Sequence, residues 1–402
     1  MPNKPLLSIV IPTKNRYNYL KILVLRLLQF KRSDFEIIIQ DNSNNNKEIS
    51  TFLNLTGDDR IKYFYHPEKL DVCANSDLAV GHSQGEYVCF VGDDDGITEE
   101  SINICYFLKK HDIDSANCNI AIYDWPDLFK KYYGYATSGE VRFQRFTGKI
   151  TEIDHDKELI KILRFGAQVV RRGVRLYQGI IRKECLDRLK AHTGTYFPGP
   201  VPDMSSAIGV IPFIDKHVFV DYPLIIAGSS GKSTAGMGAK KKHQGEIREI
   251  SHLPLNTADN WSKEIPFYWS GPTIWAEGAL QALKNTGQSD LIRYFNFNNV
   301  LALCLVYDND FRMRTIKHIF KNIGTKDVSL LKISYYVVRI WLRRVQSIFL
   351  VLASKISYQS KKSDATTVKA DSISQVIDYF SKSSIIIDFK EAILLDDNNK
   401  VI

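Results

Sequence analysis

Three consecutive aspartates, Asp93, Asp94 and Asp95, are the residues whose type and spacing most directly suggest chemistry. They follow the apolar stretch Glu86–Val91, which predicts a buried strand. Adjacent or alternate carboxylates in one loop can converge on a cation, and ligand sets made only of oxygen suit Mg²⁺ or Mn²⁺. Such a metal typically bridges carboxylates to substrate phosphates. The alternative is a solvated turn in which Asp95 caps the next helix.

Polar loops also follow two other predicted strands. Leu6–Ile11 is a short apolar run that ends at Pro12, and a polar stretch continues to Arg16. Phe35–Ile39 is a second apolar run, and the turn-rich segment 41–46 comes after it. Because the carboxyl ends of parallel strands meet at one edge of a sheet, where ligands bind, we expect both loops to face the three aspartates.

The elements that would position these loops alternate between strand and helix over the first 125 residues. Further strands are predicted at Ile61–Tyr65, Leu176–Arg182 and His217–Ile226, and helices at Arg16–Phe30 and Val72–His82. Continuously apolar strands separated by helices indicate an α/β fold with a mostly parallel sheet and helices on both faces. The helical pattern from about residue 270 onward predicts a helical C-terminal extension.

Composition excludes several other classes of protein. The 402 residues are 44% hydrophobic and 24% charged, which is typical of globular proteins and not of disordered or collagen-like ones. The six cysteines include no CxxC pair, so they indicate neither a zinc site nor a secreted disulfide framework. The N-terminal stretch lacks the features of a signal peptide. We therefore expect a protein of the cytoplasm.

Three segments together resemble the family 2 glycosyltransferases: SIVIPTKNR, EIIIQDNSNNN and ANSDLAVGHSQGEYVCFVGDDDGI. The resemblance covers about residues 6–125 well and extends more loosely to about residue 235. It implies the GT-A fold of nucleotide-diphospho-sugar transferases. It also implies an inverting enzyme that moves a sugar from a nucleotide donor to an acceptor hydroxyl, with Mn²⁺ or Mg²⁺ on the diphosphate.

The resemblance also assigns roles to individual residues. Donor contacts fall on Pro12, Thr13, Arg16, Asp41 and Asn75, with Asp41 matching the residue that binds the base. Asp77 stands where the family often has glycine after that asparagine. In the favoured alignment, Gly92 takes the place of the first aspartate of the metal motif and Asp94 is the best metal ligand, beside Asp95. In the other alignment, Asp93 contacts the donor ribose and Asp95 holds the metal.

An inverting transfer needs a general base that deprotonates the acceptor hydroxyl as it attacks. Asp203 in the segment PGPVPDMSSAIG is our candidate, because the prolines would hold its backbone rigidly and its distance from the metal loop resembles the family arrangement. Asp203 could instead cap a helix that begins near Met204. Asp124 and Glu184 are the rival acids, and Glu184 fits the first turn of a surface helix better.

The segment Gly228–Thr234 contains Gly-Lys-Ser but lacks the spacing of a phosphate-binding Walker loop. We expect a flexible loop in which Lys232, Ser233 and backbone N–H groups close over the donor diphosphate. A plain solvated loop is the alternative.

Between Val328 and Ser363 the chain has seven basic residues and no acidic ones. The apolar face of this segment is expected to comprise Ile333, Tyr336, Val337, Ile340, Trp341, Ile348, Leu352 and Ile356. A basic amphipathic helix with Trp and Tyr is typical of a segment that lies on an anionic membrane surface. The alternative is a helix that packs on the catalytic domain and exposes its basic face.

Together these features predict a metal-dependent glycosyltransferase that is peripheral at the inner face of the cell membrane and acts on a lipid-linked or surface-polysaccharide acceptor. A nucleotidyltransferase is disfavoured, because the loop Pro12–Arg16 has no glycine. A non-catalytic basic protein that binds membrane or nucleic acid is the other alternative, although no nucleic-acid motif accompanies the charge and we expect no nucleic acid partner. The predicted units are a GT-A domain (1–235, with a nucleotide-binding half 1–125 and an acceptor half 126–235), a mobile loop and helical region (236–325), the basic segment (326–362) and a C-terminal tail (363–402).

Overall fold

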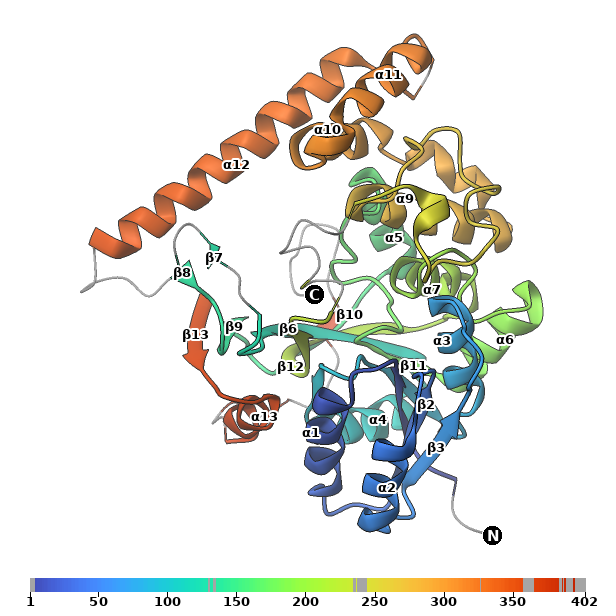
Figure 1. Cartoon of the computed structure of the whole chain (residues 1–402), viewed down its shortest axis with the longest axis vertical. Coiled ribbons are helices and arrows are strands. Elements are labelled where there is room, and N and C mark those ends of the chain that lie inside the picture. The colour runs from blue at the N-terminus through green and yellow to red at the C-terminus, as the bar shows by residue number, and fades with distance from the viewer. Residues whose placement is uncertain are drawn as a thin grey trace.

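A computed structural model of the chain describes residues 4–128, 131–132, 135–233, 236, 244–325, 327–356, 365–382, 385, 387 and 393–394. One mixed sheet crosses the molecule, with the strand order β14-β10-β12-β6-β11-β4-β1-β2-β3 (Figure 1). Its parallel half contains β1 (Leu7–Thr13), β2 (Phe35–Asp41), β3 (Ile61–Tyr65) and β4 (Tyr87–Phe90). Thr13 is paired with Asp41 in the register of β1 and β2, so the polar loops that follow these strands leave the sheet at one edge.

The other half of the sheet is mixed in direction. Its longest strands, β6 (Ser115–Asp124) and β12 (His217–Ser229), run parallel, while β11 (Ile180–Arg182) is antiparallel to both β4 and β6. The short strand β5 (Gly96–Ile97) directly follows the aspartate loop and pairs with β12. The remaining strands of this sheet are β9 (Glu140–Gln144), β10 (Ile150–Glu152), β13 (Ala365–Lys369) and β14 (Ile393–Leu394), while β7 (Lys131–Tyr132) and β8 (Tyr135–Ala136) form a separate two-stranded sheet.

Helices cover both faces of the sheet, because successive residues of its buried strands point to opposite sides. Ile9 and Ile37 pack with α1 (Tyr17–Leu28), α2 (Lys47–Thr56), α4 (Glu100–Lys110) and α13 (Ile373–Ser381). Val10 and Ile38 pack on the opposite face with α3 (Val72–Gly81), α5 (His155–Arg164), α6 (Lys183–Thr193), α7 (Pro202–Gly209), α9 (Gly271–Asn285) and α10 (Phe297–Tyr307). The predicted α/β class, with a helical C-terminal region, is confirmed.

The long helix α12 (Leu330–Ile356) follows α11 (Arg312–Asn322), packs beside α10 and runs towards the side of the molecule where β13 lies (Figure 1). In the first half of α12, the apolar face expected at the membrane packs instead on protein. Ile333 is buried, and Tyr336, Val337 and Ile340 contact the cluster formed by Leu301, Ala302 and Ile319. The side chains of Ile348, Leu352 and Ile356 lie outside the described residues. Within the described part of the chain, no helix is long and apolar enough to cross a membrane.

The chain then returns to the central sheet, where the sequence had indicated only a tail. β13 pairs antiparallel with β9, and the Tyr123 hydroxyl of β6 donates a hydrogen bond of 3.0 Å to the Ala370 carbonyl. Ile373 of α13 packs so closely on Gly96 that a Cβ atom at Gly96 would lie 2.8 Å from its Cγ1 atom. Residues 365–381 are therefore part of the core that supports the aspartate loop.

Candidate active site

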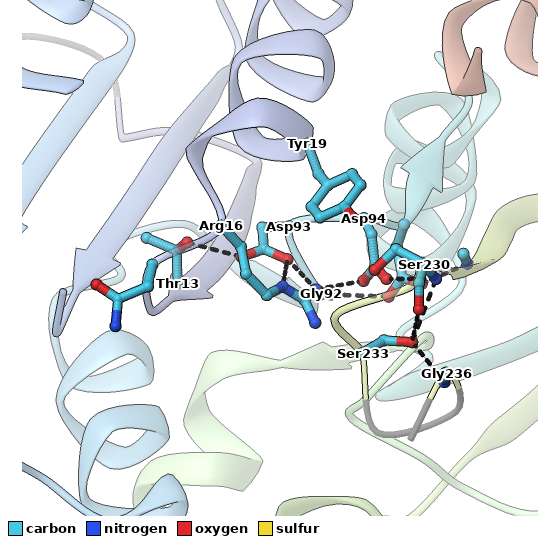
Figure 2. A network of polar contacts seen from close by, with 12 residues as sticks. Thr13, Arg16, Tyr19, Gly92, Asp93, Asp94, Ser230, Ser233 and Gly236 are labelled. Carbon is cyan, nitrogen blue, oxygen red and sulfur yellow. Dashed lines mark hydrogen bonds and ion pairs between the residues drawn. The ribbon is translucent and has the colours of Figure 1, made fainter. Parts of the chain in front are cut away.

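The loop after β1 holds the first aspartate of the cluster in place. The Thr13 hydroxyl donates a hydrogen bond of 2.6 Å to Asp93, and the Arg16 Nε donates one of 2.7 Å to the other oxygen of the same carboxylate (Figure 2). Arg16 also forms an ion pair with Asp94 at 2.5 Å. The predicted meeting of the β1 loop with the aspartates is thus observed, and Arg16 is the cation between two of the carboxylates.

Asp94 and Asp95 have different surroundings. One Asp94 oxygen accepts from the backbone N–H of Ser230 at 3.2 Å and the other contacts Arg16 (Figure 2). Asp95 is fully buried, and its oxygens accept hydrogen bonds from the backbone N–H groups of Gly92 and Gly228, both at 2.7 Å, and from Gln178. Asp95 caps no helix, because α4 begins at Glu100. Its contacts tie the aspartate loop to the end of β12.

The cluster carries more negative charge than Arg16 neutralises. Burial raises the pKa of Asp93 to about 6, against the opposing effect of Arg16, and burial and the neighbouring Asp94 raise the pKa of Asp95 to about 7. Among the described residues, no group of three or more His, Cys, Asp or Glu side chains is placed to hold a metal ion. The donor set fits a metal only as a one- or two-carboxylate site, centred on Asp94, that substrate phosphates complete.

Asp203 lies in the first turn of α7, whose N-cap is Val201, and its side chain makes no capping hydrogen bond. The helix begins at Pro202, earlier than the start expected near Met204, so the capping alternative for Asp203 is wrong. Burial raises the pKa of the Asp203 carboxyl group, and the nearby Arg175 guanidinium opposes this shift.

Residues 175–178 include side chains close to the aspartate loop, and sequence reasoning assigned them no role in the site. A Cβ atom at Gly92 would lie 3.5 Å from the Tyr177 hydroxyl. Burial raises the pKa of that hydroxyl, and the charges of Asp95, Asp203 and Asp94 raise it further. Gln178 donates to Asp95 and has a φ of +61°, a left-handed conformation that is unusual for a residue other than glycine. Strained backbone of this kind concentrates at functional sites, but no pattern in the sequence reveals it.

Two of the predicted donor contacts lie deeper in the protein than expected. Asp41 is fully buried and accepts hydrogen bonds of 2.8 Å from the hydroxyls of Tyr17 and Tyr63. Asn75 is buried in α3, and its Oδ1 atom has no hydrogen-bond partner among the described residues. Asp77, which departs from the family pattern, accepts from Lys190 and Thr195. Pro12 precedes Thr13 in β1, opposite Gln40 of β2.

The segment from Gly228 to Ser233 lies directly against the aspartates, and Thr234 is outside the described residues. Ser233 is buried, and its hydroxyl donates a hydrogen bond of 2.9 Å to the Ser230 carbonyl and accepts one of 3.1 Å from the Gly236 N–H (Figure 2). Lys232 is exposed at the tip of the turn. Of the rival acids, Asp124 is buried and paired with Arg142 at 2.9 Å, and Glu184 is exposed in the first turn of α6.

Parts of this chain are similar to known glycosyltransferases. Residues 8–174 match the family model described as glycosyl transferase family 2. An uncharacterized glycosyltransferase of Haemophilus influenzae is 28% identical over 170 residues, which are 40% of this chain and 67% of that protein. The GalNAc(5)-diNAcBac-PP-undecaprenol beta-1,3-glucosyltransferase of Campylobacter jejuni is 32% identical over 25% of this chain and 33% of its own length. A solved structure of S. aureus TarS 1–349 with UDP-GlcNAc has a TM-score of 0.43 at 13% identity, over 78% of this chain and 88% of that one.

The family match begins in β1 and extends through the aspartate loop to the segment just before Arg175. It therefore contains Thr13, Arg16 and all three aspartates, which are the residues that the structure brings together. Asp203 and the Ser230 turn lie after the matched region. Residues 8–174 are thus similar to glycosyl transferase family 2, the family that the three sequence segments resembled.

Proposed function

We propose that this chain transfers a sugar, with inversion, from a nucleotide-diphospho-sugar donor to a hydroxyl of a lipid-linked or surface-polysaccharide acceptor. The observation that carries the proposal is the polar assembly at the carboxyl edge of the sheet. In it, Thr13 and Arg16 hold Asp93, and Gln178 and the backbone of Gly228 hold Asp95. The name of the Campylobacter relative, a glucosyltransferase with an undecaprenol-linked substrate, supports the lipid-linked acceptor.

In this proposal Asp203 is the general base. Its burial raises its pKa above the ordinary value, which makes it a stronger base for an acceptor hydroxyl. Asp94 would hold Mn²⁺ or Mg²⁺, and the ion would supply charge stabilisation for the departing diphosphate. In this proposal Asp93 and residues 12–16, at the end of β1 and in the loop that follows, orient the donor. Asp41 and Asn75 also contribute to donor binding from their buried positions. Lys232 is the exposed cation that could reach the diphosphate, and Ser233 shapes the turn that carries it.

The test is hydrolysis of UDP-, GDP- and dTDP-linked sugars by the full chain, measured with Mn²⁺ and with excess chelator. We expect turnover of one donor class that requires the ion and that Asp94→Asn reduces at least tenfold. Asp156→Asn, at an exposed carboxylate on α5, is the control and should behave as wild type. Absence of hydrolysis with every donor would favour a non-catalytic binding protein.

We also propose that α12 holds the enzyme at an anionic membrane surface, through a face other than the one predicted from its sequence. Leu331, Tyr335, Val338, Leu342 and Val345 repeat at intervals of four and three residues, and all five side chains are exposed. Intervals of this kind place them on one side of a helix. Lys332 and Arg343 are exposed on the same helix, and each basic residue near an anionic surface contributes about 1 kcal/mol.

Vesicle flotation tests the membrane proposal. Leu331→Ser with Leu342→Ser should abolish flotation with anionic vesicles and leave donor hydrolysis unchanged. Leu55→Ser, at an equally exposed leucine on α2, is the matched control. Equal flotation of the double variant and wild type would show that this face is not the anchor. Substitutions are used in place of a truncation, because β13 and α13, which follow α12, belong to the catalytic core.

A further inference from the structure

A cleft of about 360 Å³ lies beside the turn that leads into α7, and most of its lining residues are outside the matched family region. Its walls are the N-terminal end of α3, the turn 197–200 before α7, the loop 254–260 and one side of α9. Cys73 at the start of α3 lines it and donates to the Gly199 carbonyl at 3.3 Å. Gly199 is four residues before Asp203 in the chain, so the cleft and the proposed base are connected through the start of α7.

The walls of the cleft are fixed in position. Buried Glu277 of α9 accepts hydrogen bonds of 3.1 Å from the Ser262 N–H, and Gln281 of α9 donates one of 2.6 Å to the Asn260 carbonyl, so the loop 254–260 is held on α9. A Cβ atom at Gly199 would lie 3.0 Å from the Gly278 carbonyl oxygen, so the turn before α7 also packs tightly on α9. The cleft is therefore preformed.

Within this rigid frame, several polar side chains border the cleft. Thr257 is one of the lining residues, and its side chain is more than nine-tenths buried. Its hydroxyl has no hydrogen-bond partner among the described residues. A buried hydroxyl without a partner is costly unless something else satisfies it. The side-chain amides of Asn256 and Asn260 are exposed on the same loop. Hydroxyl and amide groups donate and accept, as the hydroxyls of a sugar do.

The charge of the lining restricts the ligand further. Asp71, Asp77 and Glu277 line the cleft, and none of the described residues that line it is Lys or Arg. A phosphate or carboxylate would therefore meet repulsion without a cationic partner, whereas an uncharged sugar would meet polar groups and the apolar surfaces of Pro198, Pro200 and Pro254. Building on the proposed function, we infer that this cleft binds an uncharged sugar unit of the acceptor.

Saturation-transfer NMR on the full chain tests this inference without donor or turnover. The probes are the methyl glycosides of glucose, galactose, N-acetylglucosamine and N-acetylgalactosamine, together with methyl glucuronide as the anionic analogue of the glucoside. We expect transfer to at least one neutral glycoside, and at least tenfold weaker binding of the glucuronide. Thr257→Val should weaken binding of the neutral glycoside at least tenfold without lowering the melting temperature, because the hydroxyl has no partner to lose.

Thr137 provides a matched control, since its hydroxyl is equally buried and also lacks a partner among the described residues, but it does not line the cleft. Thr137→Val should bind the glycoside as wild type does. The inference is overturned if no neutral glycoside binds, if Thr257→Val binds as wild type does, or if the glucuronide binds equally well. Glycoside binding without hydrolysis of any donor would contradict the proposed function alone, and donor hydrolysis without glycoside binding would contradict the cleft assignment alone.

Discussion

Gly228 lies so close to Asp94 that a Cβ atom at position 228 would overlap the Asp94 carbonyl oxygen. The Gly228 N–H also donates to Asp95, so this one residue holds two members of the aspartate loop. Gly228→Ala must displace the loop, and we expect donor affinity to fall at least tenfold, measured by calorimetry. Gly81→Ala is the control, because its Cβ atom would meet only the end of Lys190, 4.0 Å away. That change should leave stability unchanged or raise it by about 0.4–1 kcal/mol.

Arg16 is the only cation paired with Asp93 and Asp94 in the described structure. Removing one partner from a buried pair leaves uncompensated charge, so Arg16→Gln should lower the free energy of unfolding by about 3 kcal/mol. Adding Asp93→Asn to this variant should recover part of the loss. Denaturant unfolding of both single variants and the double variant measures the coupling, and additive effects would show that the pair contributes nothing.

The same variant offers a test of cation binding that does not depend on turnover. With Arg16 replaced by Gln, the two carboxylates lack their counter-charge, so Mn²⁺ should raise the melting temperature of Arg16→Gln more than that of wild type. Arg16→Gln with Asp94→Asn should lose this response. An equal response of all three proteins to Mn²⁺ would place the bound ion elsewhere.

His217 should make the folded state sensitive to acid. Burial lowers the pKa of His217 from 6.5 to about 4, and its ring contacts the Ser115 hydroxyl and the Arg172 carbonyl at 2.8 Å each. Since the folded pKa lies below the unfolded one, the unfolded chain takes up the proton first as pH falls. Stability is therefore fully present above pH 6.5 and falls by roughly 3 kcal/mol towards pH 4. Urea unfolding of wild type and His217→Gln at pH 6.5 and pH 4 measures the effect. Other groups titrate equally in both proteins, so the difference between their losses of stability belongs to His217.

Asp203→Asn should separate catalysis from folding. The side chain makes no capping hydrogen bond, so its loss of charge should leave the melting temperature nearly unchanged. Transfer should slow by roughly 10²–10⁴ while the KM for the donor stays constant. In wild type, transfer should fall as pH drops through the raised pKa of Asp203. A variant with near-normal transfer would assign the base to another carboxylate.

The sequence predicted the parts of the site that depend on local pattern and parallel-sheet geometry. Apolar runs located β1, β2 and β4, and the rule that their carboxyl ends share an edge predicted that Thr13 and Arg16 would face Asp93. Side-chain pairing within the loop was beyond that rule. Nothing in the order of three identical aspartates distinguishes Asp95, which accepts from the backbone of Gly92 and Gly228, from Asp94, which pairs with Arg16 and accepts from Ser230.

Contacts between segments that are distant along the chain also could not be predicted from the sequence. Gln178 reaches Asp95 through a left-handed backbone that no composition signal marks. The helix α12 has the same pattern of apolar residues whether Ile333 and Val337 face lipid or protein. That pattern therefore could not show that these residues pack on α10. The cleft before α7 is lined by Thr257 and by residues of α9. Both follow residues 126–235, the part of the predicted GT-A domain that was expected to bind the acceptor.

The pairing of β13 with β9 also has a consequence for how the protein is made. A ribosome releases the N-terminal strands long before residues 365–381 have been translated. Until then, Gly96 and the β9 edge lack the cover that Ile373 and β13 provide in the finished fold. Exposed apolar surface and unpaired strand edges make incomplete chains prone to aggregation. The aspartate loop thus acquires its full support only after residues 365–381 have been made, and a message cut short before residue 365 would produce a chain that lacks this cover.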